Sequence, residues 1–185
     1  MKSKIILIIL TFAFLNLQQS YANLYFGVGG SYNMPYNNLE NYNENTTGFR
    51  FEIINKEYCN LWYGVKIDYF DLKPKEQVFP YMENTLLIQP ELKYAPFVED
   101  CYDNKLIPYV QGNLTISSIS GKDDLSKLGL GYGLGAGVCY NFKLFDKCFM
   151  LDLDGLYSLP NNIYKVENRM KIETINIGLT LSINI

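Results

Sequence analysis

The stretch Leu128-Gly129-Leu130-Gly131-Tyr132-Gly133-Leu134-Gly135-Ala136-Gly137-Val138-Cys139-Tyr140-Asn141-Phe142 decides the fold. Alternate residues are apolar from Leu128 to Phe142, and five of the residues between them are glycine. A period of two indicates an extended strand, because successive side chains of a strand point to opposite faces. One face of this strand is therefore apolar and the other almost bare. This pattern suits the wall of a narrow closed barrel, whose inside is crowded and whose outside meets hydrocarbon.

The same stretch formally contains a G-x-G-x-x-A dinucleotide-binding fingerprint at Gly131, Gly133 and Ala136. That fingerprint requires a strand before it and a helix that begins within it. Here the alternation of a strand continues to Phe142 instead. The sequence therefore favours a strand whose bare face is a lumen-facing glycine stripe: Gly129, Gly131, Gly133, Gly135 and Gly137.

Residues 1–22 have the pattern of a secretory signal peptide. Lys2 and Lys4 precede an apolar run that is short for a membrane span, and the small residues Ser20 and Ala22 suit cleavage before Asn23. An uncleaved amino-terminal anchor is the alternative, and either implies export. We expect residues 23–185 to form one domain.

Composition excludes several classes of function. The net charge is −3, and removal of Lys2 and Lys4 makes it more negative, which argues against a nucleic-acid surface. No apolar run after the leader is long enough for a transmembrane helix. The chain has no histidine and no C-x-x-C pair, so we expect no zinc or other metal, and no cofactor.

Eight extended segments follow Asn23 and predict an all-β fold, an eight-stranded antiparallel up-and-down transmembrane β-barrel. An even number of strands places both termini at the same end. Pro90 interrupts the fourth segment, and we expect a bulge or a local break there. The segments are Leu24–Met34, Gly48–Asn55, Leu61–Tyr69, Leu86–Tyr94, Leu106–Ile116, Leu128–Phe142, Phe149–Tyr157 and Thr174–Ile185.

The connections alternate in length. Those after the first, third, fifth and seventh segments, Ser117–Lys127 among them, are long, and the others are short. Short periplasmic turns and longer outer loops are typical of outer-membrane barrels. All four cysteines then lie near the short-turn end. We predict disulfides between Cys139 and Cys148 and between Cys59 and Cys101, with four reduced thiols as the alternative.

If the apolar face points outward, eight charged side chains point into the lumen. Buried charges are tolerated when they pair or stay hydrated, so we predict an ion-pair network in a largely closed lumen. Aromatic residues near the segment ends are typical of the two membrane interfaces, although a soluble sandwich also has strand aromatics. The lumen charges are Arg50, Glu52, Lys66, Asp68, Glu91, Lys93, Asp152 and Asp154.

Several stretches, in order and spacing, resemble the eight-stranded outer-membrane β-barrels of Gram-negative bacteria, in the OmpA-like and opacity-protein-like porin superfamily. They are Leu24–Tyr32, Ile107–Gly112, and Gly131–Val138 with the hairpin that continues to Leu151–Asp154. The last strand looks like the family's assembly signal, at Asn176, Gly178, Leu181 and Ile183. Family members usually end in an aromatic residue, whereas this chain ends in Ile185.

The resemblance implies residence in the bacterial outer membrane. The expected partners are outer-membrane lipid, the barrel-assembly machinery and a surface ligand from the host or environment. A non-enzymatic role in envelope structure or surface interaction is the leading expectation. A narrow channel resembling OmpW, for small or hydrophobic solutes, and a soluble ligand-carrying barrel like a lipocalin with the faces reversed are the alternatives.

A paired-carboxylate catalytic site at Glu91, Asp152 and Asp154 is a further alternative. Strand alternation already explains where these residues fall. Small outer-membrane enzymes that resemble lipid A deacylases or omptin proteases rely on a catalytic histidine, which this chain lacks. We therefore expect no enzyme.

Overall fold

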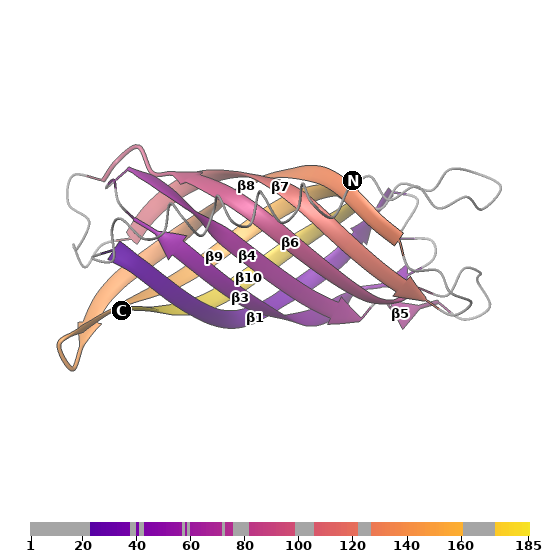
Figure 1. The fold of residues 1–185 in the computed structure, drawn as a ribbon, viewed down its shortest axis with the longest axis horizontal. Coiled ribbons are helices and arrows are strands. Elements are labelled where there is room, and N and C mark those ends of the chain that lie inside the picture. Colours follow the sequence, from indigo (N-terminus) through magenta and orange to yellow (C-terminus); the bar gives the residue numbers. More distant parts are fainter. Residues whose placement is uncertain are drawn as a thin grey trace, which may run out of the picture.

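The fold is a closed barrel of eight antiparallel strands, as predicted, seen in a computed structural model that describes residues 23–37, 40, 43–56, 58, 60–71, 73–75, 82–98, 106–121, 127–160 and 173–185. The proposed signal peptide lies outside the described residues. Figure 1 shows the strands inclined to the long axis of the barrel. They are β1 (Leu24–Tyr36), β3 (Thr46–Asn55), β4 (Leu61–Asp71), β6 (Met82–Tyr94), β7 (Leu106–Gly121), β8 (Lys127–Leu144), β9 (Lys147–Pro160) and β10 (Glu173–Asn184).

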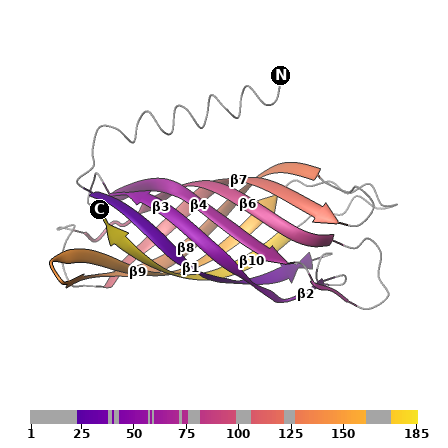
Figure 2. The same cartoon turned by 60° about the horizontal axis from the view of Figure 1, so that its bottom comes forward.

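The first and last strands close the barrel. β1 pairs with β10 from Tyr25 opposite Asn184 to Tyr36 opposite Glu173, and on its other edge with β3. β1 therefore begins where β10 ends, as Figures 1 and 2 show. We call this the terminal end of the barrel and the other the distal end.

A second, two-stranded sheet lies at the distal end. There β2 (Asn43–Glu44) pairs with β5 (Lys73–Pro74), and the Lys75 ammonium donates to the Glu40 carbonyl oxygen at 2.6 Å. These contacts join the connection after β1 to the connection after β4.

The strict alternation of long and short connections is wrong. Ser117–Gly121, predicted as loop, continues β7 and pairs with β6 and β8, so only residues 122–126 separate β7 from β8. Residues 95–105, predicted as a shorter connection, separate β6 from β7. Serines outside the apolar alternation carry no signal of a strand, but ladder hydrogen bonds satisfy their backbone all the same.

Pro90 breaks one ladder without a bulge. On one side of β6 it lies opposite Val65 in continuous pairing with β4. On the other side, pairing with β7 stops after Ile88 and resumes at Glu91 in the same register. The register shift of β6 lies instead between Met82 and Asn84. The missing N–H of proline thus costs pairing with one neighbour and leaves the register intact.

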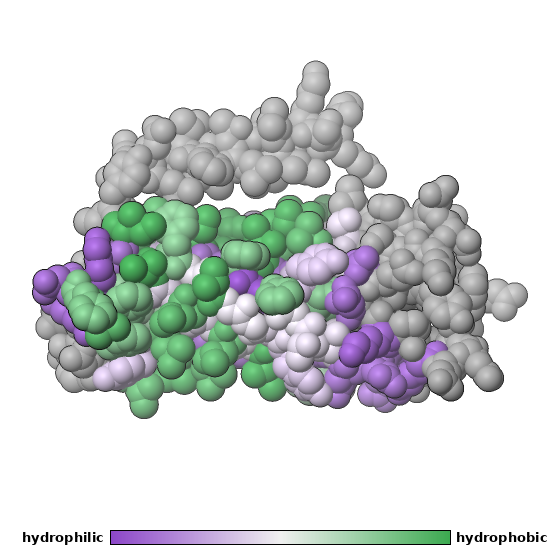
Figure 3. Space-filling model, turned by 90° about the horizontal axis from the view of Figure 1, so that it is seen from below, coloured by the Kyte–Doolittle hydropathy of each residue, from purple (hydrophilic) through white to green (hydrophobic). Residues whose placement is uncertain are grey.

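Apolar side chains cover the outside of the barrel. Phe49 is 71% exposed and Leu134 66% exposed, in strands whose alternate residues are buried. Figure 3 shows the hydrophobic side chains over the middle of the barrel and hydrophilic ones toward the ends. We call this surface the apolar belt; its members include Val28, Phe49, Phe51, Leu92, Val110, Leu114, Leu130, Leu134, Leu153, Leu179 and Leu181. Within the described residues, no helix is both long and apolar enough to cross a membrane.

Candidate functional site

The lumen is the candidate functional site, because it gathers buried charged side chains from four strands. All eight sequence-predicted lumen charges are buried. β3 supplies Arg50 and Glu52, β4 supplies Lys66 and Asp68, and β6 supplies Glu91 and Lys93; Asp152 and Asp154 come from β9. We call these eight residues the lumen network.

Arg50 is the first of three cations that hold the lumen network together. Its Nε lies 2.7 Å from Asp68 Oδ1, and its Nη2 donates to Asp68 Oδ2 at 3.1 Å, which makes a bidentate pair. Nη1 binds Asp154 across the lumen. Nη2 also donates to Asn176 Oδ1 at 2.5 Å. Arg50 therefore links β3 to β4, β9 and β10.

Lys66 and Lys93 continue the network. Lys66 Nζ lies 2.5 Å from Asp154 Oδ2 and 3.0 Å from Glu91 Oε2. Lys93 Nζ lies 2.5 Å from Glu52 Oε1, 2.6 Å from Asp152 Oδ2 and 3.5 Å from Glu91 Oε1. The Asp68–Arg50–Asp154–Lys66–Glu91–Lys93 chain is thus unbroken. Each of the five carboxylates contacts at least one base.

Two neutral side chains that the sequence did not mark for the network support its acids. Tyr109 donates its hydroxyl to Asp152 Oδ1 at 2.6 Å, and Lys93 Nζ lies 5.0 Å from the centre of its ring. Gln111 donates to Asp154 Oδ2 at 2.9 Å. Both lie on the inward face of β7, so alternation alone could have pointed to them.

The glycine stripe provides room for these side chains. A Cβ on Gly137 would collide with the Tyr109 hydroxyl group and ring, and one on Gly133 would lie 2.5 Å from Asn113 Oδ1. A Cβ on Gly135 would lie 3.1 Å from Gln111 Nε2. Gly129 and Gly131 lie on the same inward face of β8.

Two residues of the proposed assembly signal also belong to the lumen. Asn176 accepts a hydrogen bond from Arg50, and a Cβ on Gly178 would occupy the space of the Arg50 guanidinium group. Leu181 is exposed on the outer face, and Ile183 has the same outward parity. The motif thus combines two residues that accommodate Arg50 with two that face outward.

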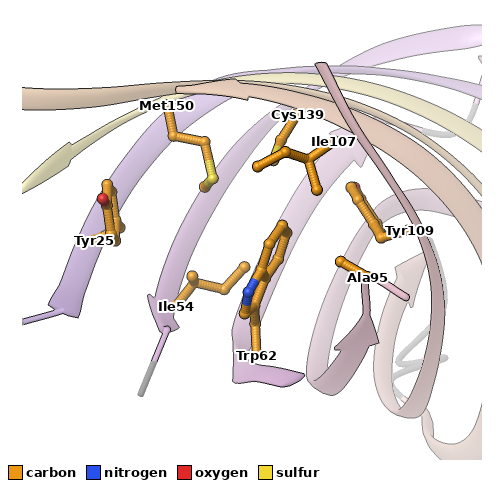
Figure 4. Packing of buried hydrophobic residues seen from close by; sticks show 8 residues of the cluster. All are labelled: Tyr25, Ile54, Trp62, Ala95, Ile107, Tyr109, Cys139 and Met150. Carbon is orange, nitrogen blue, oxygen red and sulfur yellow. The ribbon is translucent and has the colours of Figure 1, made fainter. Parts of the chain in front are cut away.

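An apolar cluster closes the lumen at the terminal end. Figure 4 shows its side chains pointing toward one another from several strands. Trp62 and Tyr109 have ring centres 5.7 Å apart. We call this cluster the inner plug; it consists of Tyr25, Ile54, Trp62, Ala95, Ile107, Tyr109, Cys139 and Met150.

Lys56, which the sequence placed in a turn, is buried against the inner plug. Its ammonium lies 4.0 Å from the Trp62 ring centre and 5.0 Å from that of Tyr25, and donates to Asn141 Oδ1 at 3.1 Å. No ion pair involves Lys56 in the part of the chain that the structure describes. Burial lowers the pKa of Lys56 from its usual value. The two aromatic faces provide cation–π stabilisation in place of a carboxylate.

The predicted disulfide between Cys139 and Cys148 does not form, and both thiols are free. Register explains this result: Cys139 lies opposite Asp152, whereas Cys148 lies opposite Lys143, four residues further along β8. Four strand residues span roughly 13 Å, well beyond the roughly 7 Å limit for the Cα atoms of a disulfide. Cys59 and Cys101, the other predicted pair, lie outside the described residues.

Toward the distal end, amide and hydroxyl side chains line the lumen. Gln89 donates to Ser158 Oγ at 3.3 Å and to Thr115 Oγ1 at 3.4 Å, and the two hydroxyl groups lie 3.3 Å apart. These are long hydrogen bonds. The lumen therefore has three layers, apolar at the terminal end, charged in the middle and hydroxyl- and amide-rich toward the distal end.

Comparison with known proteins identifies the fold. No protein-family model and no curated protein matches the chain. Among solved structures, Neisserial surface protein A matches with a TM-score of 0.62 and 16% identity over 88% of this chain and 97% of that one. Ail, the attachment invasion locus protein of Yersinia pestis, matches with a TM-score of 0.50 and 11% identity over 88% and 97%. The chain has the fold of the eight-stranded outer-membrane β-barrels.

Proposed function

We propose that this chain is a non-enzymatic barrel of the bacterial outer membrane, with a closed lumen and a role in envelope structure or surface interaction. The apolar belt supports residence in a bilayer, because contiguous apolar surface of this extent is not left in water. A soluble ligand-carrying barrel would need the reverse arrangement, an apolar interior under a polar exterior.

The observation that carries the closed lumen is the combination of the lumen network with the inner plug. Arg50, Lys66 and Lys93 bind carboxylates on other strands, and Trp62 and Tyr109 fill the terminal end beneath them. An ion that crosses the barrel would have to separate buried ion pairs and displace packed aromatic rings, both of which are costly. This arrangement supports a structural barrel over a narrow channel.

The same ion pairs support a non-enzymatic role. Each of the candidate catalytic carboxylates, Glu91, Asp152 and Asp154, contacts a lysine or arginine. A general acid or base must reach a substrate proton, and these groups are occupied and buried. We infer that they hold the walls of the barrel together.

We assign surface interaction to the distal end, where β2 and β5 form a sheet separate from the barrel. With the termini in the periplasm, this end faces the exterior. Neisserial surface protein A, which shares the fold, is by its name a surface protein. The barrel-assembly machinery is the expected partner during insertion.

Two measurements test the proposal. Heat-modifiable migration on a denaturing gel and dependence on detergent are expected of a membrane barrel, and a chain soluble without detergent would exclude it. Planar-bilayer recordings should then show no discrete conductance steps, with a porin of known conductance as the positive control. Regular steps from the pure chain would exclude the closed lumen and favour the channel.

A further inference from the structure

The β8–β9 hairpin projects from the terminal end of the barrel. β8 runs to Leu144 and β9 begins at Lys147, yet β7 pairs with β8 only as far as Tyr140, and β10 pairs with β9 only as far as Phe149. Figure 1 shows the hairpin at the lower left, beyond the start of β1 and flared away from the barrel wall. Its tip therefore lacks neighbours within the described barrel.

The turn at the tip has an unusual residue in an unfavourable conformation. Phe145 and Asp146 have φ of 49° and 59°, a pattern that two-residue hairpins usually fill with asparagine and glycine. A bulky residue with positive φ is strained. Phe145 is also 90% exposed, so no packing within the described chain offsets that strain.

The outward face of the hairpin continues the apolar belt. Phe142 stacks on Phe149 with ring centres 5.5 Å apart, and on Tyr140 with ring centres 6.0 Å apart. Next along the hairpin, Leu144 lies opposite Lys147. Apolar and aromatic side chains thus lead to a tip that carries exposed Lys143 and Lys147.

We propose that this tip is a lipid anchor, with Phe145 inserted at the boundary between headgroups and acyl chains and Lys147 bound to a lipid phosphate. The inference rests on the proposed outer-membrane function. Continuity with the apolar belt and the outward flare favour lipid over a partner protein. Aromatic and basic side chains together are typical of surfaces that bind anionic lipid.

Tryptophan fluorescence in vesicles tests the anchor. The chain has one tryptophan, Trp62, which is buried in the lumen and gives the baseline. Phe145→Trp is compared with Leu134→Trp in the apolar belt and with Glu44→Trp at the distal end, in vesicles whose acyl chains are brominated near the headgroup. We expect strong quenching above baseline for Phe145→Trp and little for Glu44→Trp.

The Leu134→Trp variant separates the two proposals. If it is quenched while Phe145→Trp is not, the barrel is in the bilayer and the anchor is excluded. If neither is quenched, the proposed membrane location fails as well. Emission of Phe145→Trp that shifts with protein density in the membrane, without quenching, would assign the tip to a second copy of the chain and overturn the anchor.

Lipid charge provides the second arm. Quenching of Phe145→Trp should be stronger in phosphatidylglycerol than in phosphatidylcholine vesicles, and added Lys147→Glu should abolish the difference. Lys75→Glu at the distal end is the matched charge control and should leave it unchanged. Equal quenching in both lipids, or loss of the difference with Lys75→Glu, would exclude phosphate binding by Lys147.

Discussion

Lys66 of β4 crosses the lumen to Asp154 of β9, with Nζ 2.5 Å from Oδ2. Four positions separate these strands in the eight-strand order, so the two residues stand on opposite walls. Glu52, which lies directly opposite Lys66 in the β3–β4 ladder, forms its ion pair with Lys93 instead. Arg50–Asp68 and Lys66–Glu91 join neighbouring strands. The pairs of Lys66 with Asp154 and of Lys93 with Asp152 cross the lumen instead.

Replacement of Lys66 by methionine should destabilise the barrel strongly. Asp154 and Glu91 would each lose a buried partner, and removal of one partner of a buried pair costs about 3–5 kcal/mol. Denaturant unfolding in detergent measures the loss. Lys75→Met, at an exposed residue directly after β5, is the matched control, with an expected change within about 0.5 kcal/mol. Equal stability of the two variants would show that the ion pairs contribute little.

Gly178→Ala should prevent folding even without assembly machinery. Its Cβ would overlap the Arg50 guanidinium group, so that side chain would have to leave its carboxylates. Refolding into detergent, read by heat-modifiable migration, measures the effect. Gly155→Ala, whose Cβ would meet nothing nearer than 4.0 Å, is the control. If Gly178→Ala refolds in detergent and fails only in cells, the glycine acts through recognition by the machinery alone.

Gly133→Phe should obstruct closure of the barrel, whereas Leu134→Phe should be tolerated. The first introduces a ring where the Asn113 side chain lies, and the second changes a residue of the apolar belt that is 66% exposed. The folded fraction of each variant in the same gel assay provides the comparison. If both variants fold equally well, our assignment of the inward and outward faces of β8 is wrong.

Lys56→Met should alter how stability depends on pH. Burial lowers the pKa of Lys56 below its ordinary value of 10.5, so between the lowered pKa and 10.5 the unfolded chain binds more protons than the folded one. Stability of the parent should therefore rise with pH in this window, and Lys56→Met should lack that rise. Unfolding free energies of both chains, measured from neutral pH toward 10, give the difference. Parallel curves would contradict a buried, charge-disfavoured Lys56.

The barrel itself was predictable because period-two alternation governs every strand that faces both lumen and lipid. Apolar residues and glycines alternate on both sides of Gly133 and Leu134, and this alternation indicates which face each residue occupies. Ser117 could not be assigned in this way, because β7 extends into a region where neither face is apolar. Strand ends outside the alternating region depend on partners that are distant in sequence.

Pairing across the lumen was not predictable from alternation. The inward direction of Lys66 follows from its place in the strand, but its choice of Asp154 over Glu52 depends on the width of the barrel. Lys56 lies outside any strand pattern, so its burial against Trp62 had no signal. The failed Cys139–Cys148 pairing has the same origin, because hairpin register rather than proximity to a turn sets which residues meet.

Closure of β1 against β10 also sets an order in time. The first strand to be synthesised has one edge that only the last strand can satisfy, so that edge stays open until the chain is nearly complete. The lumen site of Arg50 is also incomplete until then, because the two residues that accommodate its guanidinium group, Gly178 and Asn176, belong to β10. A chain that ends before β10 therefore lacks both the β1–β10 ladder and the residues that accommodate Arg50.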